Sequence, residues 1–460
     1  MDDAKPARLG MLSLVCLVIG NMIGTGVYVS SGYSLHDLGD AKLVLWVWLI
    51  AGVHALFGAI AYAAVIRRLP ISGGEYTILS RWAHPAFGFL AGWISIIAGF
   101  ASPIAINAKL MAKMAIPSSE GSVFSQGIDR TTTEFIIAVM VIVGAATLHW
   151  IEIRWNAWVN NAIVVLKLCG FTLFLMMGLY WTTYHGTSGI TTRNHPGESN
   201  LLLGFLSSLY YTALAYTGFN ASIYLAGEIA SDRETREEQR SRIHNISRSM
   251  VIACFIVFLF YMSLNYVFLY SIPADELVQS GEGFVAVVAK AVGGEPFEGL
   301  IRWLIILSTG TSVLAMTMTG PQVYAQMGRD YNLSKWFASD RSMVRCAIFL
   351  QTILALLILL SSSIRDVASY LGLTLTVCGA MAISSLWLSK RHLQSKEWTP
   401  LAWWEQMAAA GYVLGAGIMF ATAYRIAWVQ FCWCLGTFLL GGLFFTFFRR
   451  MSAEKSQPLH

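Results

Sequence analysis

The fold is decided by residues 9–36, LGMLSLVCLVIGNMIGTGVYVSSGYSLH, where 28 successive positions contain no Asp, Glu, Lys or Arg. About 20 apolar residues suffice for one straight helix to cross a bilayer, so this stretch is longer than a single crossing requires. Its middle reads Gly20-Asn21-Met22-Ile23-Gly24-Thr25-Gly26, and each glycine weakens a helix by roughly 1 kcal/mol relative to alanine. We therefore predict a membrane-spanning helix that is interrupted near its centre.

A second stretch of the same kind covers residues 199–227, where 29 positions are free of charge. Its middle reads Tyr216-Thr217-Gly218-Phe219-Asn220-Ala221-Ser222. Glycine in a span can simply allow two helices to pack closely. Long, glycine-interrupted spans at matching places in two halves of a chain instead mark the midplane site of a secondary transporter. We favour this second interpretation.

The composition places the whole chain in a bilayer. Of 460 residues, 56% are hydrophobic and 12% are charged, whereas soluble domains contain about 25% charged residues. We therefore expect an all-α polytopic membrane protein, whose first apolar run lacks a cleavage site and stays as a span. The apolar runs predict twelve transmembrane helices, at residues 11–31, 43–65, 86–112, 134–151, 157–181, 203–227, 249–271, 299–326, 345–361, 366–389, 407–425 and 428–448.

The basic residues predict the topology. With the N-terminus in the cytoplasm, 21 Lys and Arg residues fall in cytoplasmic segments and 9 on the other side. Because cytoplasmic loops carry an excess of Lys and Arg, we expect both termini inside and the chain in a plasma membrane, such as the cytoplasmic membrane of a bacterium. The net charge of +5 follows from this bias and indicates no nucleic acid partner.

Other functional classes lack their motifs. The sequence contains no G-x-x-x-x-G-K-[ST] phosphate-binding loop, so an ATP-driven pump is not expected. The seven cysteines have no metal-ligand spacing, and we expect neither a metal nor a cofactor. No pattern indicates an enzyme.

The two interruptions predict the kind of solute. The second interrupted span lies five spans after the first. Because five is an odd number, the second half threads the membrane in the opposite direction, as an inverted repeat. At an interruption, freed N–H groups can face a carboxylate and freed carbonyls can face an ammonium. A zwitterion such as an α-amino acid fits both poles.

A few polar residues inside the spans are further candidates. Lys167 is the only charged residue in the fifth predicted span, and a lysine at a helix centre costs about 2.5 to 3.5 kcal/mol on insertion scales. Lys167 either ties helices together, acts as a fixed cation, or exchanges a proton during transport. Glu75 and Glu228 are possible gate residues or solvated charges. Phe219 has two interpretations: it closes over a bound solute, or it packs in the core. His54 likewise either carries a proton or is a packing residue.

Four segments carry a resemblance to a known family: IGNMIGTGVYVSSG, PISGGEYTILSRW, AIVVLKLCG and AYTGFNASIYLAGE. With them, the chain resembles the amino acid–polyamine–organocation superfamily, and is most similar to its proton-dependent, sodium-independent amino acid permeases. The resemblance implies a fold like that of the sodium-coupled leucine transporter. That fold has two inverted five-helix repeats, here residues 11–181 and 203–389, and two peripheral helices within 407–448. Residues 1–10 and 449–460 are the expected cytoplasmic ends.

The resemblance also implies site residues. The substrate carboxylate falls on Thr25, Gly26 and Val27, and the amino group lies near Asn21, Met22 and Tyr216. The full expected binding set is Asn21, Met22, Ile23, Gly24, Thr25, Gly26, Val27, Tyr216, Thr217, Gly218, Phe219 and Asn220. Lys167 occupies the place of a sodium ion, close to the carbonyl of Gly20 and to the hydroxyls of Ser308, Thr311 or Ser312.

We therefore expect a secondary transporter that moves α-amino acids by alternating access without sodium, by proton symport or by amino acid exchange. One alternative is an antiporter of amino acids against amines such as polyamines or decarboxylation products. Another is a membrane sensor that binds an amino acid without net flux. Whether an accessory subunit takes part is left open.

Overall fold

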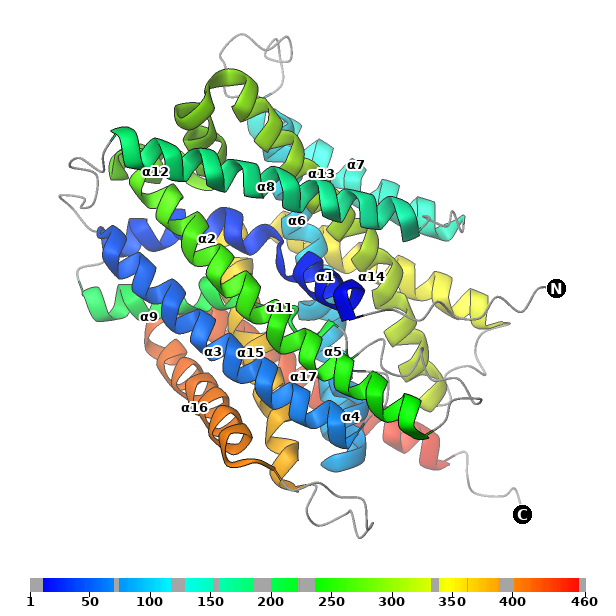
Figure 1. Ribbon diagram of the computed structural model, residues 1–460. Coiled ribbons are helices and arrows are strands. Elements are labelled where there is room, and N and C mark those ends of the chain that lie inside the picture. Colours follow the sequence, from blue (N-terminus) through cyan, green and yellow to red (C-terminus); the bar gives the residue numbers. More distant parts are fainter. Residues whose placement is uncertain are drawn as a thin grey trace, which may run out of the picture.

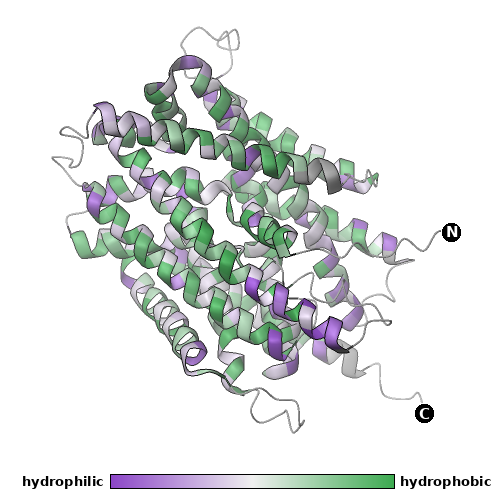
Figure 2. Cartoon of the chain, in the orientation of Figure 1, coloured by the Kyte–Doolittle hydropathy of each residue, from purple (hydrophilic) through white to green (hydrophobic). Residues whose placement is uncertain are grey.

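In the computed structural model of the protein, helices and their connectors make up the described residues, and no strand occurs among them (Figure 1). The structure describes residues 11–69, 74–116, 129–151, 157–185, 200–221, 223, 236–331, 339–361, 363–388 and 401–454. Hydrophobic residues cover most of each long helix, and hydrophilic residues gather toward helix ends (Figure 2). This distribution is typical of a bundle whose middle lies in lipid.

The first half of the chain forms five long segments, of which the first and third are irregular. The third runs through a π-helical turn, η1. The elements are α1 (Met11–Met22), α2 (Thr25–Leu38), α3 (Ala41–Arg68), α4 (Gly74–Trp82), α5 (Pro85–Ile94), η1 (Ser95–Ala101), α6 (Ser102–Ala115), α7 (Arg130–Trp150) and α8 (Ala157–His185).

The second half begins with a short apolar helix and ends with the two helices α16 and α17. The elements are α9 (Leu201–Ala215), α11 (Arg236–Tyr270), α12 (Ala274–Gln279), η3 (Gly281–Gly283), α13 (Phe284–Asp330), α14 (Asp340–Ser361), α15 (Ile364–Leu388), α16 (Trp403–Ile426) and α17 (Trp428–Glu454). Within α13, Gly294 has a φ of 75° and separates two helices at a kink.

The prediction of an all-α, multi-pass membrane protein is confirmed. Among the described residues, ten helices are long and apolar enough to cross a membrane, and the bent pair of α1 and α2 adds an eleventh span. The predicted sixth span begins with α9, which has 15 residues, and residues 222 and 224–227 of its continuation lie outside the described residues. The count of twelve spans therefore stays a prediction.

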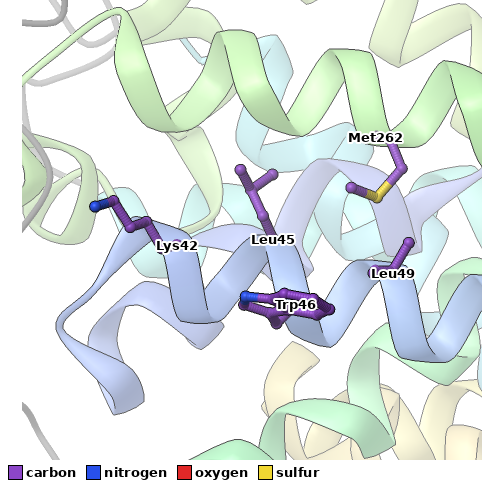
Figure 3. Close-up of a pocket in the computed structure, with 5 residues that line it drawn as sticks. All are labelled: Lys42, Leu45, Trp46, Leu49 and Met262. Atoms are coloured by element: carbon purple, nitrogen blue, oxygen red, sulfur yellow. The ribbon is translucent and has the colours of Figure 1, made fainter.

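Large apolar side chains cover the outside of the bundle, as a lipid environment requires. A shallow groove of about 280 Å³ between α3 and α11 belongs to this surface (Figure 3), and its lining consists of Lys42, Leu45, Trp46, Leu49 and Met262. Trp46 is 56% exposed, whereas Trp48 on the opposite face of α3 is buried. The groove is therefore suited to lipid chains and is a poor candidate for a zwitterion site.

The two halves pack in a regular pattern. The first interrupted helix contacts the second through α2 and α9, and α3, α6 and α7 each contact the helix five spans later, which are α11, α13 and α14 respectively. The cross contacts are reciprocal as well, because α1 packs on α11 while α9 packs on α3. The expected repeat of the first five spans in the second half stays a prediction.

One helix contact depends on a missing side chain. A Cβ atom on Gly372 of α15 would lie 1.7 Å from the carbonyl oxygen of Tyr210 on α9. Backbone therefore packs against backbone at this crossing, which brings α15 directly onto the helix that leads into the second interruption.

We expect Gly372→Ala to destabilise the protein, because the added methyl group forces the two backbones apart. Overpacking of a core typically costs about 1 to 3 kcal/mol. Thermal unfolding of the purified protein in detergent measures the effect. Gly417→Ala on α16 is the matched control, since a Cβ atom there meets nothing within 4 Å. An unchanged melting temperature for Gly372→Ala would contradict the close contact.

Candidate functional site

The first interruption lies between α1 and α2, whose axes are bent by 44°. The amide of Ile23 still bonds to the carbonyl of Ile19 at 3.0 Å, so the helix stops after this residue. Gly24 is extended, with φ −139° and ψ −159°, and no side chain caps the N-terminus of α2. The first turn of α2, which contains Thr25, Gly26 and the buried Val27, therefore presents N–H groups at the positive end of a helix.

The carbonyls at the end of α1 are satisfied by side chains from two other helices. Lys167 of α8 donates to the carbonyls of Gly20 at 3.2 Å and Ile23 at 2.8 Å. Tyr261 of α11 donates its hydroxyl to the carbonyl of Met22 at 2.8 Å. The negative end of α1 thus meets a cation, which is the favourable arrangement for a helix C-terminus.

Lys167 is 3% exposed, and within the described residues both of its hydrogen bonds go to α1. The structure does not join it to the hydroxyls of α13. Ser308 accepts a hydrogen bond from Tyr28 at 3.3 Å, and Thr311 and Ser312 bond to carbonyls of their own helix. Gly20 is therefore a hydrogen-bond partner of Lys167, as expected, whereas the hydroxyls of α13 are not.

A side chain of the third span bonds to the first turn of α2, on the other side of the interruption. Thr25 donates its hydroxyl to the amide oxygen of Asn107 on α6 at 2.6 Å. The amide nitrogen of Asn107 donates to the carbonyl of Pro103 at 2.8 Å. Asn107 and Tyr261 were not predicted as site residues. For Asn107 the signal was a single amide in an apolar span, because polar residues in a membrane usually have a structural or functional partner.

The glycines of this interruption have different surroundings. A Cβ atom on Gly26 would lie 2.5 Å from Cα of Ala215 at the end of α9. Gly26 therefore permits the contact between the two interrupted helices, rather than the approach of a solute. A Cβ atom on Gly24 would meet nothing within 4 Å, so Gly24 is the position that borders open space.

The second interruption follows α9 and is joined directly to the first. Gly218 has a φ of 98°, a conformation that residues with a side chain rarely adopt. Its carbonyl accepts a hydrogen bond from the amide nitrogen of Asn21 at 3.2 Å. A Cβ atom on Gly218 would lie 2.6 Å from that nitrogen. The two unwound segments are therefore in contact, as the prediction of a shared site requires.

Aromatic rings surround the junction. Tyr216 donates its hydroxyl to the carbonyl of Trp48 at 3.2 Å, and its ring lies 5.2 Å from that of Tyr261. The next residue, Thr217, bonds to the carbonyl of Leu214 at 2.7 Å. These contacts satisfy the groups of the turn at the end of α9 with local partners and with α3.

A buried carboxylate lies beside the second interruption. Glu75 of α4 is 8% exposed and accepts hydrogen bonds from the hydroxyl of Tyr62 at 2.9 Å and the amide of Asn220 at 2.6 Å. The ring of Phe219 meets that of Tyr62 edge-on, with centroids 5.8 Å apart. The other possible gate residue, Glu228, lies outside the described residues.

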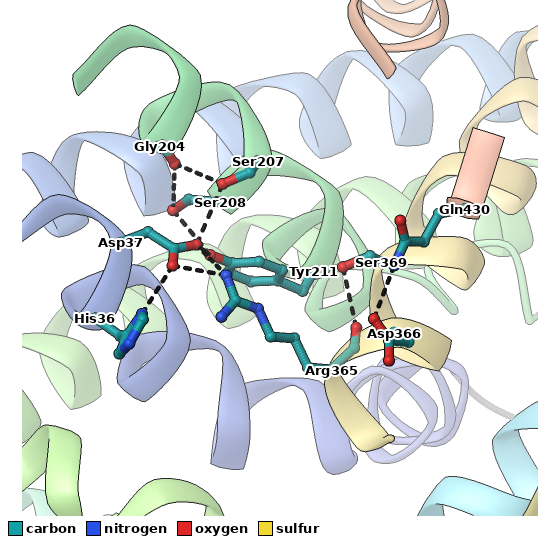
Figure 4. A network of polar contacts seen from close by, with 10 residues as sticks. All are labelled: His36, Asp37, Gly204, Ser207, Ser208, Tyr211, Arg365, Asp366, Ser369 and Gln430. Carbon is teal, nitrogen blue, oxygen red and sulfur yellow. Dashed lines mark hydrogen bonds and ion pairs between the residues drawn. The ribbon is translucent and has the colours of Figure 1, made fainter. Parts of the chain in front are cut away.

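A second acidic cluster closes the opposite end of α2 (Figure 4). Asp37 is 1% exposed, and one nitrogen of Arg365 on α15 lies 2.6 and 2.5 Å from its two oxygens. Tyr211 and Ser207 of α9 donate to the same carboxylate at 2.5 and 3.2 Å. The guanidinium also lies over the rings of Tyr33 and Tyr211, 5.7 and 5.8 Å from their centroids. This cluster was not predicted.

The site around the two interruptions therefore combines backbone poles and neutral hydrogen-bonding groups with the ammonium of Lys167 and the carboxylate of Glu75. Within the described ranges, no three His, Cys, Asp or Glu residues are placed to hold a metal ion. Uncapped N–H groups on α2 and free lone pairs on carbonyls at both interruptions suit a solute that carries a negative and a positive group.

The bundle of apolar helices and the two joined interruptions define a secondary membrane transporter rather than an enzyme. A family model described as amino acid permease matches residues 9–452, and the chain belongs to this family. The protein is thus an amino acid transporter of the membrane.

Relatives differ in their named substrates. The serine/threonine exchanger SteT of Bacillus subtilis (strain 168) is 27% identical over 79% of this chain and 78% of its own. The human large neutral amino acids transporter small subunit 2 is 23% identical over 80% of this chain and 67% of its own. The mouse b(0,+)-type amino acid transporter 1 is 22% identical over 82% of this chain and 75% of its own.

The different surroundings of the two glycines give a direct test. Gly24→Val should abolish amino acid binding without loss of thermal stability, because the side chain enters open space next to the uncapped N–H groups. Gly26→Ala should lower the melting temperature, since its Cβ atom would collide with the backbone of Ala215. A ligand-induced thermal shift measures both effects. Undiminished binding by a stable Gly24→Val protein would exclude this place as the site.

Proposed function

We propose that the protein exchanges α-amino acids across a plasma membrane by alternating access. The substrate carboxylate binds at the N-terminus of α2, around Gly24, Thr25, Gly26 and Val27. The substrate ammonium binds at carbonyls of the two interruptions, around Asn21 and the segment from Tyr216 to Asn220. The observation that carries this proposal is the hydrogen bond between Asn21 and Gly218, which unites both interruptions in one place.

The inverted repeat is part of the proposal. Contacts between α3 and α11, between α6 and α13 and between α7 and α14 pair each span with its counterpart five spans later. Two repeats that thread the membrane in opposite directions would produce such pairs. The bias of Lys and Arg supports a cytoplasmic location for both termini.

The two ends of the pathway differ in a way that supports alternating access. On the outer side of this topology, the buried carboxylate of Asp37 pairs with the partly exposed guanidinium of Arg365 and ties α2 to α15. Ser34 and Thr212 are buried on α2 and α9, and among the described residues their hydroxyls have no hydrogen-bond partner. Buried polar groups without partners are rare in proteins, and they are explained here if water reaches them when the outer side opens. We infer that the structure represents an outward-closed state.

Lys167 replaces a sodium ion in this proposal. Its ammonium holds the carbonyls of Gly20 and Ile23, which is the role that a bound cation could play at the end of an interrupted helix. The transporter is therefore expected to work without sodium. Loss of a proton from Lys167 would release these carbonyls, so that proton symport is the alternative to exchange.

We further propose that the chain works without a disulfide-linked accessory subunit. The name of the human relative includes the words small subunit, so the question arises for this protein. Disulfides form and persist in oxidising surroundings such as the extracellular space, so a disulfide between subunits needs a cysteine outside the bilayer. All seven cysteines lie within helices, at Cys16, Cys169, Cys254, Cys346, Cys378, Cys432 and Cys434.

Proteoliposomes distinguish the candidate functions. We expect uptake of labelled serine or another neutral amino acid only when the vesicles contain unlabelled amino acid. Uptake into empty vesicles that follows a pH gradient would replace exchange by proton symport, and uptake that requires an internal polyamine would indicate an amine antiporter. Saturable binding without any flux would identify a sensor and overturn the proposal.

Replacing Lys167 by Met tests its role as a fixed cation. The two carbonyls of α1 lose a charged donor, and a hydrogen bond to a charged group contributes about 1.5 to 3 kcal/mol. We expect exchange to fall by roughly one to two orders of magnitude while the protein stays folded, and the remaining rate to be independent of pH between 5 and 9. The exposed Lys42→Met is the control. Wild-type exchange by Lys167→Met would refute the role.

A further inference from the structure

The helix α16 belongs to the pair that follows the two repeats, and Figure 1 shows it along the edge of the bundle beside α3. One of its side chains nevertheless enters the core, because Tyr412 is buried. Glycines on two different helices leave room for it. A Cβ atom on Gly58 of α3 would lie 2.7 Å from the ring of Tyr412, and one on Gly379 of α15 would lie 2.9 Å from its hydroxyl.

The same two glycines show what the ring of Tyr412 meets. The Cβ position of Gly58 is also 2.8 Å from the tip of the Phe219 ring. The Cβ position of Gly379 is also 3.4 Å from the hydroxyl of Tyr62. Tyr412 therefore lies next to Phe219 with its ring and next to Tyr62 with its hydroxyl, and it hydrogen-bonds with Thr376 of α15.

These neighbours belong to the second interruption. Phe219 directly follows Gly218, whose carbonyl joins the two interruptions. Tyr62 donates to Glu75, which in turn accepts from Asn220. Tyr412 thus lies close to Phe219, and Glu75 bonds to the next residue of the unwound segment, Asn220.

The position of Tyr412 is held by α3. The rings of His54 and Tyr412 stack with centroids 4.3 Å apart and an angle of 12°, and His54 bonds to the carbonyl of Tyr412 at 3.0 Å. A Cβ atom on Gly415 would lie 2.5 Å from the ring of His54. At the start of α16, the buried Glu405 pairs with Arg67 and Arg68 of α3. Little freedom is left for Tyr412 to move relative to α3.

We propose that Tyr412 is a positioning residue of the transport cycle, so that α16 takes part in transport rather than only surrounding the repeats. It does not touch the substrate. Its ring, which α3 holds in place, forms a wall beside Phe219 and the Tyr62 hydroxyl. This wall limits where these two groups can lie when the second interruption has the conformation seen here. This inference rests on the proposed function, because it assigns a role at the same site.

Two substitutions separate the ring from the hydroxyl. Tyr412→Phe keeps the wall and removes one hydroxyl, and we expect exchange turnover to fall by no more than about 3-fold. Tyr412→Leu removes the wall beside Phe219, and we expect turnover to fall about 10-fold or the KM to rise about 10-fold, with a melting temperature close to that of the wild type. Exchange in proteoliposomes at varied external amino acid gives both constants.

A matched control lies at the neighbouring positions of the same helix contact. Phe57 of α3 packs against Gly411 of α16, because a Cβ atom on Gly411 would lie 2.7 Å from its ring, and it is not among the residues placed at the interruptions. Phe57→Leu loosens the contact between α3 and α16 without altering the wall beside Phe219. We expect its KM and turnover to match those of the wild type.

A second variant keeps the test decisive if Tyr412→Leu unfolds. Gly58→Ala keeps Tyr412 and adds a methyl group 2.7 Å from its ring and 2.8 Å from the Phe219 ring, so it displaces the two rings relative to each other. A fall in turnover or a rise in KM in a folded Gly58→Ala protein supports the wall, and wild-type kinetics in that variant would contradict it. Unchanged kinetics in Tyr412→Leu, or equal losses in Phe57→Leu, would overturn the inference while leaving exchange by the wild type intact. Absence of exchange in the wild type would overturn the proposed function itself.

Discussion

A helix that stops inside a bilayer leaves N–H and carbonyl groups that lipid cannot satisfy, and the rest of this structure depends on how those groups are partnered. Lys167 and Tyr261 occupy the carbonyls at the end of α1. The N–H groups at the start of α2 have no side-chain cap. One pole of the interruption is therefore already neutralised by the protein, and the other remains for the negative group of a solute. The carbonyls at the end of α1 explain why a single lysine in the membrane is tolerated.

The two ends of the pathway are built from different interactions. On one side, the buried carboxylate of Asp37 pairs with the partly exposed guanidinium of Arg365, which lies over the rings of Tyr33 and Tyr211. Removal of Arg365 would leave a buried carboxylate without its cation, which is costly. On the other side, Glu75 accepts hydrogen bonds from Tyr62 and Asn220.

Much of the fold could be predicted because it follows from local properties of the chain. The expected interruption in residues 20–26 contains the observed break between Met22 and Thr25, since glycine content and missing charge act on the helix in which they occur. The expected span at 366–389 differs by only a residue or two from α15, because hydropathy marks where lipid ends. The cluster around Asp37 could not be predicted in this way, as its members lie 174 and 328 positions apart along the chain.

The sequence by itself determined that the chain spans a membrane, where its first helix breaks, and that Lys167 must point inward, because each of these is a matter of transfer between water and lipid. Only the tertiary structure decided that Gly26 meets Ala215 while Gly24 borders open space. It also decided that Lys167 bonds to α1 rather than to the hydroxyls of α13, and that Tyr412 reaches Phe219. The physical reason is that a side chain's partner depends on which distant helices pack together, and the local sequence of one helix does not specify which helices these are.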